Sequence, residues 1–145
     1  MNKKHEIEFK GISMSPLLKE GDKLLVDIKS DKFTLGDIIV IMDKEHELLC
    51  HRVIQTSPLQ TKGDRNLYID QAKSIVGVVT HIKKKSNLIS LNTNLLWKSI
   101  QAYLCRMNNH KNEFRKIPLL ILFIMNLWSL RNEKRSVENH TQELE

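Results

Sequence analysis

The feature that most limits the possible folds is a series of short apolar segments between residues 6 and 82, separated by turn-forming residues. Short runs rich in β-branched and apolar residues, bounded by Gly and Asp, are typical of strands. We expect strands over residues 23–28, 37–42, 48–54, 67–69 and 75–82. Ile7 and Phe9 alternate with charged residues, which predicts a further edge or half-buried strand that leads into the serine stretch. Gly-Asp pairs that begin at residues 21, 36 and 63 suit turns. The sequence therefore predicts a mostly β fold.

The second half of the chain has a different pattern. Apolar side chains fall at helical spacing over residues 94–107, which predicts an amphipathic helix. A chain of 145 residues with 41% hydrophobic residues can bury one core and carry an appendage. We therefore expect a β domain over residues 1–85 and a helical extension over residues 86–131. The polar, charged composition of residues 132–145 predicts a disordered tail.

Ile117–Leu130 is an almost unbroken apolar run of fourteen residues, interrupted by Asn126. A transmembrane helix needs about 20 residues, so this segment is expected to dock on the core or to lie at an interface. Basic residues on both sides favour peripheral contact with a membrane surface. Both alternatives stay open at this point.

The net charge of +6 and the pI near 9.4 are compatible with an anionic partner. No interleaving of aromatic and basic residues and no recognition module is visible, so we expect no nucleic-acid partner. Two cysteines do not make a disulfide framework. The first ten residues are polar and contain no apolar stretch that resembles a signal peptide or an N-terminal anchor. We expect a protein that is cytoplasmic or peripheral to the membrane.

Three stretches contain the residue types of a nucleophilic hydroxyl site: a serine, a base and a carboxylate. Ser13 and Ser15 are two residues apart and would point to the same side of an extended segment, so spacing cannot choose between them. His51 lies in an apolar segment, where a histidine is either a satisfied core residue or a general base. Asp64 and Asp70 are both candidates for the carboxylate that orients it.

Four sequence boxes occur in one order: Ser13-Met14-Ser15-Pro16, Gly36-Asp37-Ile38-Ile39-Val40, His51-Arg52-Val53-Ile54, and Thr61-Lys62-Gly63-Asp64-Arg65-Asn66 followed by Asp70. Together they resemble the type I signal peptidases, and more narrowly the archaeal and endoplasmic-reticulum branch, where a histidine replaces the lysine base. The resemblance covers about residues 11–80. It implies a small β fold of the signal-peptidase and repressor type, and a serine endopeptidase that removes a signal or leader segment from a precursor peptide without a metal or cofactor.

The resemblance also implies roles for single residues. Ser13 matches the nucleophile, His51 the base and Asp70 the orienting carboxylate, with Asp64 as the alternative. The Ser13 backbone N–H, with Gly11 permitting close approach, would hold the oxyanion. Lys62 does not stand where the bacterial enzymes place their lysine.

This sequence departs from the family in two respects. The twelve residues before Ser13 are too few for the membrane helix of the family, so we expect no such anchor, and Gly11 stands where related enzymes often have a serine. These departures motivate an alternative of another class, a non-catalytic module on the same fold that binds a peptide or a partner protein.

Overall fold

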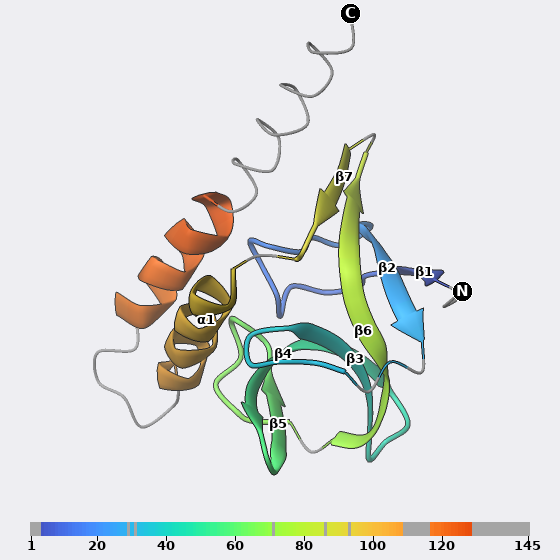
Figure 1. Cartoon of the computed structure of the whole chain (residues 1–145), viewed down its shortest axis with the longest axis horizontal. Helices are drawn as coiled ribbons and strands as arrows, with labels where there is room; N and C mark the ends of the chain where they lie inside the picture. Colours follow the sequence, from blue (N-terminus) through green and yellow to red (C-terminus); the bar gives the residue numbers. More distant parts are fainter. Residues whose placement is uncertain are drawn as a thin grey trace, which may run out of the picture.

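The computed structural model describes residues 4–28, 30, 32–70, 72–85, 87–92, 94–108 and 117–128. These residues form one antiparallel sheet and two C-terminal helices, so the predicted mostly β fold is confirmed (Figure 1). The strands are β1 (Lys4–Glu8), β2 (Lys23–Ile28), β3 (Ile38–Asp43), β4 (Leu48–Thr56), β5 (Leu59–Lys62), β6 (Ala72–Lys84) and β7 (Asn87–Ser90). The helices are α1 (Leu95–Met107) and an apolar helix over residues 117–128.

The long strand β6 is the centre of the sheet. The strand order is β1-β2-β6-β3-β4-β5, and β7 pairs with the end of β6. Irregular register occurs between Leu25 and Val26 of β2 and between Val40 and Ile41 of β3. Such bulges increase the local bend and twist of a strand pair. Figure 1 accordingly shows β6 as a curved strand, with β1 and β2 on one side and β3, β4 and β5 on the other.

Most predicted strands occur within a few residues of their expected positions. The predicted strand over residues 67–69 is wrong, because this segment lies in the loop after β5, where Tyr68 and Ile69 are exposed. Two strands are not predicted by the sequence pattern. β5 is a short, polar strand that pairs with β4, and β7 is a four-residue strand that pairs with β6. Both are specified by their partner strands more than by their own residues.

The loop between β1 and β2 is held to the core by its own side chains. Met14, Leu17 and Leu18 are buried among side chains of the β1, β2 and β6 region. At the base of the loop, the Phe9 N–H donates to the carbonyl of Asp22 and the Gly21 N–H donates to that of Phe9. Burial of three large side chains on one short loop favours a single loop conformation. This conformation fixes the position of Ser13.

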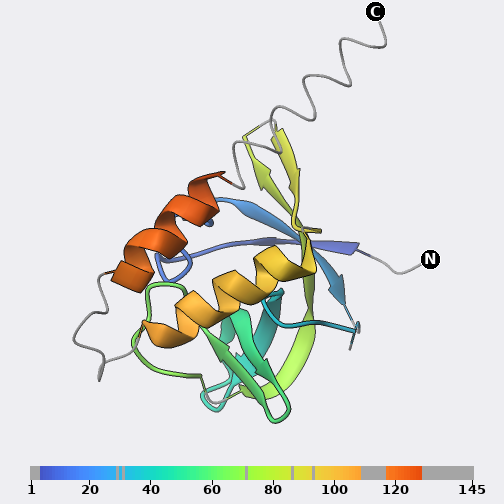
Figure 2. The ribbon, with the colours of Figure 1, turned by 60° about the vertical axis from the view of Figure 1, so that its left-hand side comes forward.

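The predicted helix over residues 94–107 is confirmed. The Asn94 side chain accepts a hydrogen bond from the Leu96 N–H at 2.8 Å and caps the N-terminus of α1. The helix over residues 117–128 lies along the outer side of α1 in both views (Figure 1, Figure 2). Ile54 of β4 shares a hydrophobic cluster with both helices. The helices therefore pack on the sheet and complete its core.

The helix predicted over Ile117–Leu130 is observed as far as residue 128, and its last two residues lie outside the described part of the chain. The predicted disordered tail over residues 132–145 also lies outside it. Within the described residues, no helix has the length and hydrophobicity required to cross a bilayer.

Gly36 lies where α1 approaches the turn before β3. Its φ is +87°, and a Cβ at this position would lie 2.2 Å from the Lys98 carbonyl oxygen. Gly21 has a similar φ of +84°, but a Cβ there would meet no atom within 4 Å. An alanine at Gly21 would thus meet only an unfavourable backbone conformation, whereas an alanine at Gly36 would also meet a steric clash with α1.

We predict that Gly21→Ala lowers the free energy of unfolding by about 1 kcal/mol, through backbone conformation alone. Gly36→Ala should lower it by about 3 kcal/mol or more, because the added methyl group must also displace α1. Urea denaturation of the two variants and the wild type measures both values. Equal losses in the two variants would contradict the close helix contact.

Candidate active site

Ser13, His51 and Asp70 form one chain of hydrogen bonds. Nε2 of His51 lies 3.0 Å from Oγ of Ser13, and Nδ1 of the same ring lies 2.7 Å from Oδ2 of Asp70. The three residues come from the β1–β2 loop, from strand β4 and from the loop that follows β5. The structure thus brings together the three residues that the sequence boxes indicate, and the hydroxyl next to His51 is that of Ser13.

The arrangement defines how protons are shared. An ionised carboxylate can only accept, so the Nδ1–H of neutral His51 donates to Asp70, and Nε2 is left to accept the Ser13 hydroxyl proton. The His51 side chain is 4% exposed and that of Asp70 is 9% exposed, so water competes little for these bonds. His51 is therefore oriented as a base toward Ser13.

Thr61 is a site residue that the sequence did not reveal. Its hydroxyl donates to Oδ2 of Asp70 at 2.8 Å, the oxygen that also receives the His51 bond. The Asp70 N–H donates to the Thr61 carbonyl at 2.9 Å. Asp70 is thus held through both its backbone and its side chain. A threonine at the end of a short polar strand is too common to signal this role from sequence alone.

Gly63 allows the loop after β5 to approach the serine. A Cβ at residue 63 would lie 2.9 Å from Cβ of Ser13, closer than real Cβ contacts. The neighbouring Arg65 N–H donates to the Ser13 carbonyl at 2.9 Å. The sequence predicts only a turn at Gly63. Gly11, in contrast, has φ +90° and open space where a methyl group would stand, so its backbone conformation accounts for glycine there.

Asp64 has a different partner from Asp70. Its two carboxylate oxygens accept from Nε and Nη2 of Arg52 at 2.7 and 2.8 Å, and both side chains are almost completely buried. Burial acts to lower the pKa of Arg52, but the charge and hydrogen bonds of Asp64, together with the more distant Cys105 and Asp37, outweigh it and hold that pKa above its ordinary value. Asp64 is therefore the counter-ion of Arg52, and Asp70 is the carboxylate that contacts His51.

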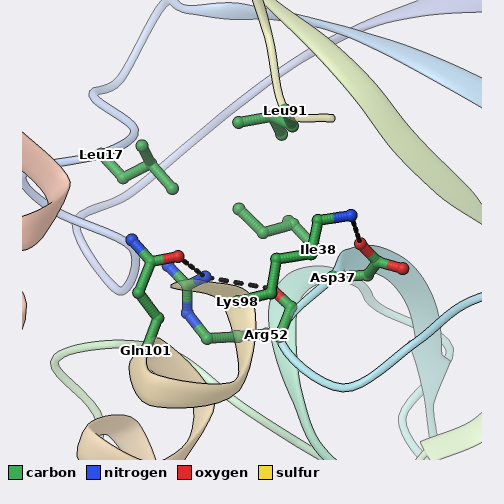
Figure 3. A pocket seen from close by; sticks show the side chains of 8 residues that line it. Leu17, Asp37, Ile38, Arg52, Leu91, Lys98 and Gln101 are labelled. Atoms are coloured by element: carbon green, nitrogen blue, oxygen red, sulfur yellow. Dashed lines mark hydrogen bonds and ion pairs between the residues drawn. The ribbon is translucent and has the colours of Figure 1, made fainter. Parts of the chain in front are cut away.

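The Arg52–Asp64 ion pair is connected to both helices. Nη1 of Arg52 donates to the Gly36 carbonyl and to Oε1 of Gln101 in α1, each at 3.1 Å (Figure 3). Asn126 of the second helix donates to Oδ2 of Asp64 at 3.0 Å and accepts from Nε2 of Gln101 at 2.9 Å. Asn126, a polar residue within the apolar run, thus completes a buried hydrogen-bond network next to the His51 strand.

Lys62 lies apart from the serine's hydrogen bonds. The residue is 1% exposed, and its ammonium group donates to the carbonyls of Cys105 and Asn108 at the C-terminal end of α1. Burial lowers the pKa of Lys62. A cation at this end of a helix is favoured by the helix dipole. Lys62 therefore joins β5 to α1.

A pocket of about 220 Å³ opens beside Ser13 and His51. Its walls come from the end of β1 and the residues after it, and from the first half of β4, with Leu24 and Val40 at its base. Most of its lining is apolar, including Ile7, Phe9 and Leu49. The pocket therefore offers an apolar side-chain site within reach of the serine hydroxyl.

Comparisons of the chain with protein-family models, curated proteins and solved structures gave no significant match. Among the described residues, no group of three or more His, Cys, Asp or Glu side chains is arranged to hold a metal ion. The chemistry that the site can perform is thus read from its geometry. A serine hydroxyl, an oriented imidazole and a buried carboxylate can transfer a proton from the hydroxyl oxygen to the ring.

We predict that Asp64→Asn lowers the free energy of unfolding by about 3–5 kcal/mol, because it leaves the buried Arg52 charge without a counter-ion. Urea denaturation measures the loss. Glu6→Gln serves as the control, since it removes the exposed ion pair with Lys23 and should leave the unfolding midpoint almost unchanged. A similar small effect for Asp64→Asn would contradict the role of the buried pair.

Proposed function

We propose that this chain is a serine endopeptidase that resembles the histidine-dependent branch of the type I signal peptidases. The observation that carries the proposal is the Ser13–His51–Asp70 hydrogen-bond chain, with distances of 3.0 and 2.7 Å. A serine, a base and an orienting acid in this geometry form the arrangement that activates a hydroxyl for attack on a carbonyl. The resemblance of the four sequence boxes supports the same assignment.

In the first half of the reaction, Oγ of Ser13 attacks the carbonyl carbon of the scissile peptide bond while its proton moves to Nε2 of His51. Asp70 stabilises the imidazolium that forms, through the bond to Nδ1. The carbonyl oxygen becomes an oxyanion, for which the Ser13 backbone N–H is the proposed donor. When the tetrahedral intermediate collapses, His51 gives its proton to the leaving amine, and the carbon–nitrogen bond breaks.

In the second half, water replaces the leaving peptide. His51 takes a proton from the water as its oxygen attacks the ester carbonyl of acylated Ser13. Collapse of this second intermediate breaks the ester bond, and His51 returns the proton to Oγ of Ser13. The products are a carboxylic acid and the restored enzyme, so no cofactor is consumed.

The edges of two strands support an extended peptide as the substrate. Within the described residues, β1 pairs with β2 alone, and the first residues of β4, up to His51, pair with β3 but not with β5. These free backbone edges lie at the two sides of the apolar pocket. An extended peptide can hydrogen-bond to such edges and place alternate side chains in pockets. We expect small or apolar side chains before the cleaved bond, as in a signal or leader segment.

We predict that Ser13→Ala and His51→Ala each lower cleavage of a precursor peptide library by about 10⁴-fold or more, because each removes a member of the proton-transfer chain. Mass spectrometry of the products gives the rates and the cleavage sites. Ser15→Ala is the matched control and should retain activity, since the hydroxyl at His51 belongs to Ser13.

Full activity of folded Ser13→Ala would refute the assignment. If the wild type binds peptides from the library but cleaves none, the non-catalytic peptide-binding module becomes the better description of the site.

We further predict that Asp70→Asn lowers kcat by about 10³–10⁴-fold with little change in KM, because an amide no longer stabilises the imidazolium and can favour the wrong ring tautomer. Steady-state kinetics on a cleaved peptide measure both constants. Thr61→Val tests the support of Asp70 and should cause a smaller loss of kcat. An unchanged kcat for Asp70→Asn would remove Asp70 from the mechanism.

A further inference from the structure

The helix over residues 117–128 has two chemically different faces. Its inner face is buried and includes Leu122, Met125 and Asn126. Its outer face exposes large apolar side chains, each between 42% and 58% exposed: Ile117, Leu120, Ile121, Phe123, Ile124, Leu127 and Trp128. Among these twelve residues, every exposed side chain is apolar. A contiguous apolar surface of this kind marks a site of interaction with a partner or a membrane.

The outer face belongs to a docked helix and is therefore presented on a fixed support. Asn126 is completely buried and donates to the Asp64 carboxylate at 3.0 Å. Leu122 and Met125 pack with Ile54 of the sheet. The apolar residues on the outer face cannot reach the core while these contacts hold the inner face. These apolar side chains can therefore be buried only by a partner, a membrane or a segment outside the described residues.

The charges around the helix favour an anionic surface as the covering partner. No charged residue lies between Ile117 and Leu130, whereas Arg115 and Lys116 precede this run. Arg131, Lys134 and Arg135 follow it, and the only acidic residue among them is Glu133. Juxtamembrane basic residues of this kind are attracted to anionic lipid headgroups. A second copy of the chain carries the same basic flanking residues, so self-association gains no charge complementarity from them.

The length of the described helix favours an orientation parallel to the membrane plane over one that spans the bilayer. Its twelve described residues extend over about 18 Å, at about 1.5 Å per residue. The hydrocarbon core of a bilayer is about 30 Å thick, so the twelve described residues are too few to cross it. A helix with one apolar face instead lies parallel to the membrane plane, about 5–10 Å deep at the boundary between headgroups and acyl chains. Trp128 suits this boundary because its ring combines an apolar body with a polar N–H.

We propose that the outer face of the helix over residues 117–128 binds the surface of an anionic lipid bilayer. The apolar side chains enter the headgroup region, and the basic residues that flank the run in the sequence add electrostatic attraction to the anionic surface. The inference depends on exposure and charge and is independent of the proposed peptidase activity. An inactive Ser13→Ala chain would bind lipid as the wild type does.

The test is sedimentation of the full chain with vesicles. We compare vesicles of pure phosphatidylcholine with vesicles in which about 30% of the lipid is anionic phosphatidylglycerol. The wild type should bind the anionic vesicles, bind the neutral ones at least about tenfold more weakly, and dissociate as salt is raised. Leu120→Ser/Ile124→Ser should weaken binding to anionic vesicles by about tenfold or more, because it removes two apolar side chains from the buried face.

Leu48→Ser/Leu88→Ser is the matched control, because these two side chains are similarly exposed but lie on β4 and β7. It should bind as the wild type does. Circular dichroism checks that both double variants fold. Failure of the wild type to bind anionic vesicles, or equal binding by the two double variants, would overturn the proposal. A dimer in sedimentation velocity without lipid, lost only in Leu120→Ser/Ile124→Ser, would assign the face to a second copy instead.

Discussion

The ion pair between Arg52 and Asp64 lies where the sheet, the loop after β5 and both helices meet. Each partner would be costly to bury alone, so the two must be placed together and their remaining hydrogen bonds satisfied. Gln101 and Asn126 provide these bonds from the two helices. The position of the helices is thus tied to a charge pair between the β4 strand and the loop after β5.

This buried pair is next to the residues of the candidate active site in the chain. Arg52 follows His51 on β4, and Asp64 follows Gly63, whose lack of a side chain allows the loop to approach Ser13. Anchoring Arg52 and Asp64 therefore limits the movement of the strand and the loop on either side of the serine. If the proposed peptidase activity holds, such support matters, because small displacements of a base or nucleophile reduce a reaction rate strongly.

The apolar helix combines two requirements in one short segment. On its inner face, Asn126 donates a hydrogen bond to Asp64 of the buried ion pair. On its outer face, all the exposed side chains are apolar. An apolar helix with one buried amide is therefore compatible with docking on the core and with contact at a membrane surface. The observed burial of Leu122 and Met125 confirms the first of the two alternatives from the sequence, docking on the core, and contact of the outer face with a membrane stays a proposal.

The sequence by itself determined the mostly β fold and the helix over residues 94–107, because alternation, helical spacing and turn chemistry are local properties. The resemblance of the four boxes added Ser13, His51 and Asp70 as the residues to examine. On spacing alone, the sequence left Ser13 against Ser15 and Asp64 against Asp70 open. Tertiary structure decided both, since Ser13 and His51 are 38 residues apart and His51 and Asp70 are 19 apart. Strands β5 and β7, the Thr61 bond to Asp70 and the bond of Asn126 to Asp64 also came only from the folded chain. These contacts depend on which strands and helices pack together, and no local pattern specifies that.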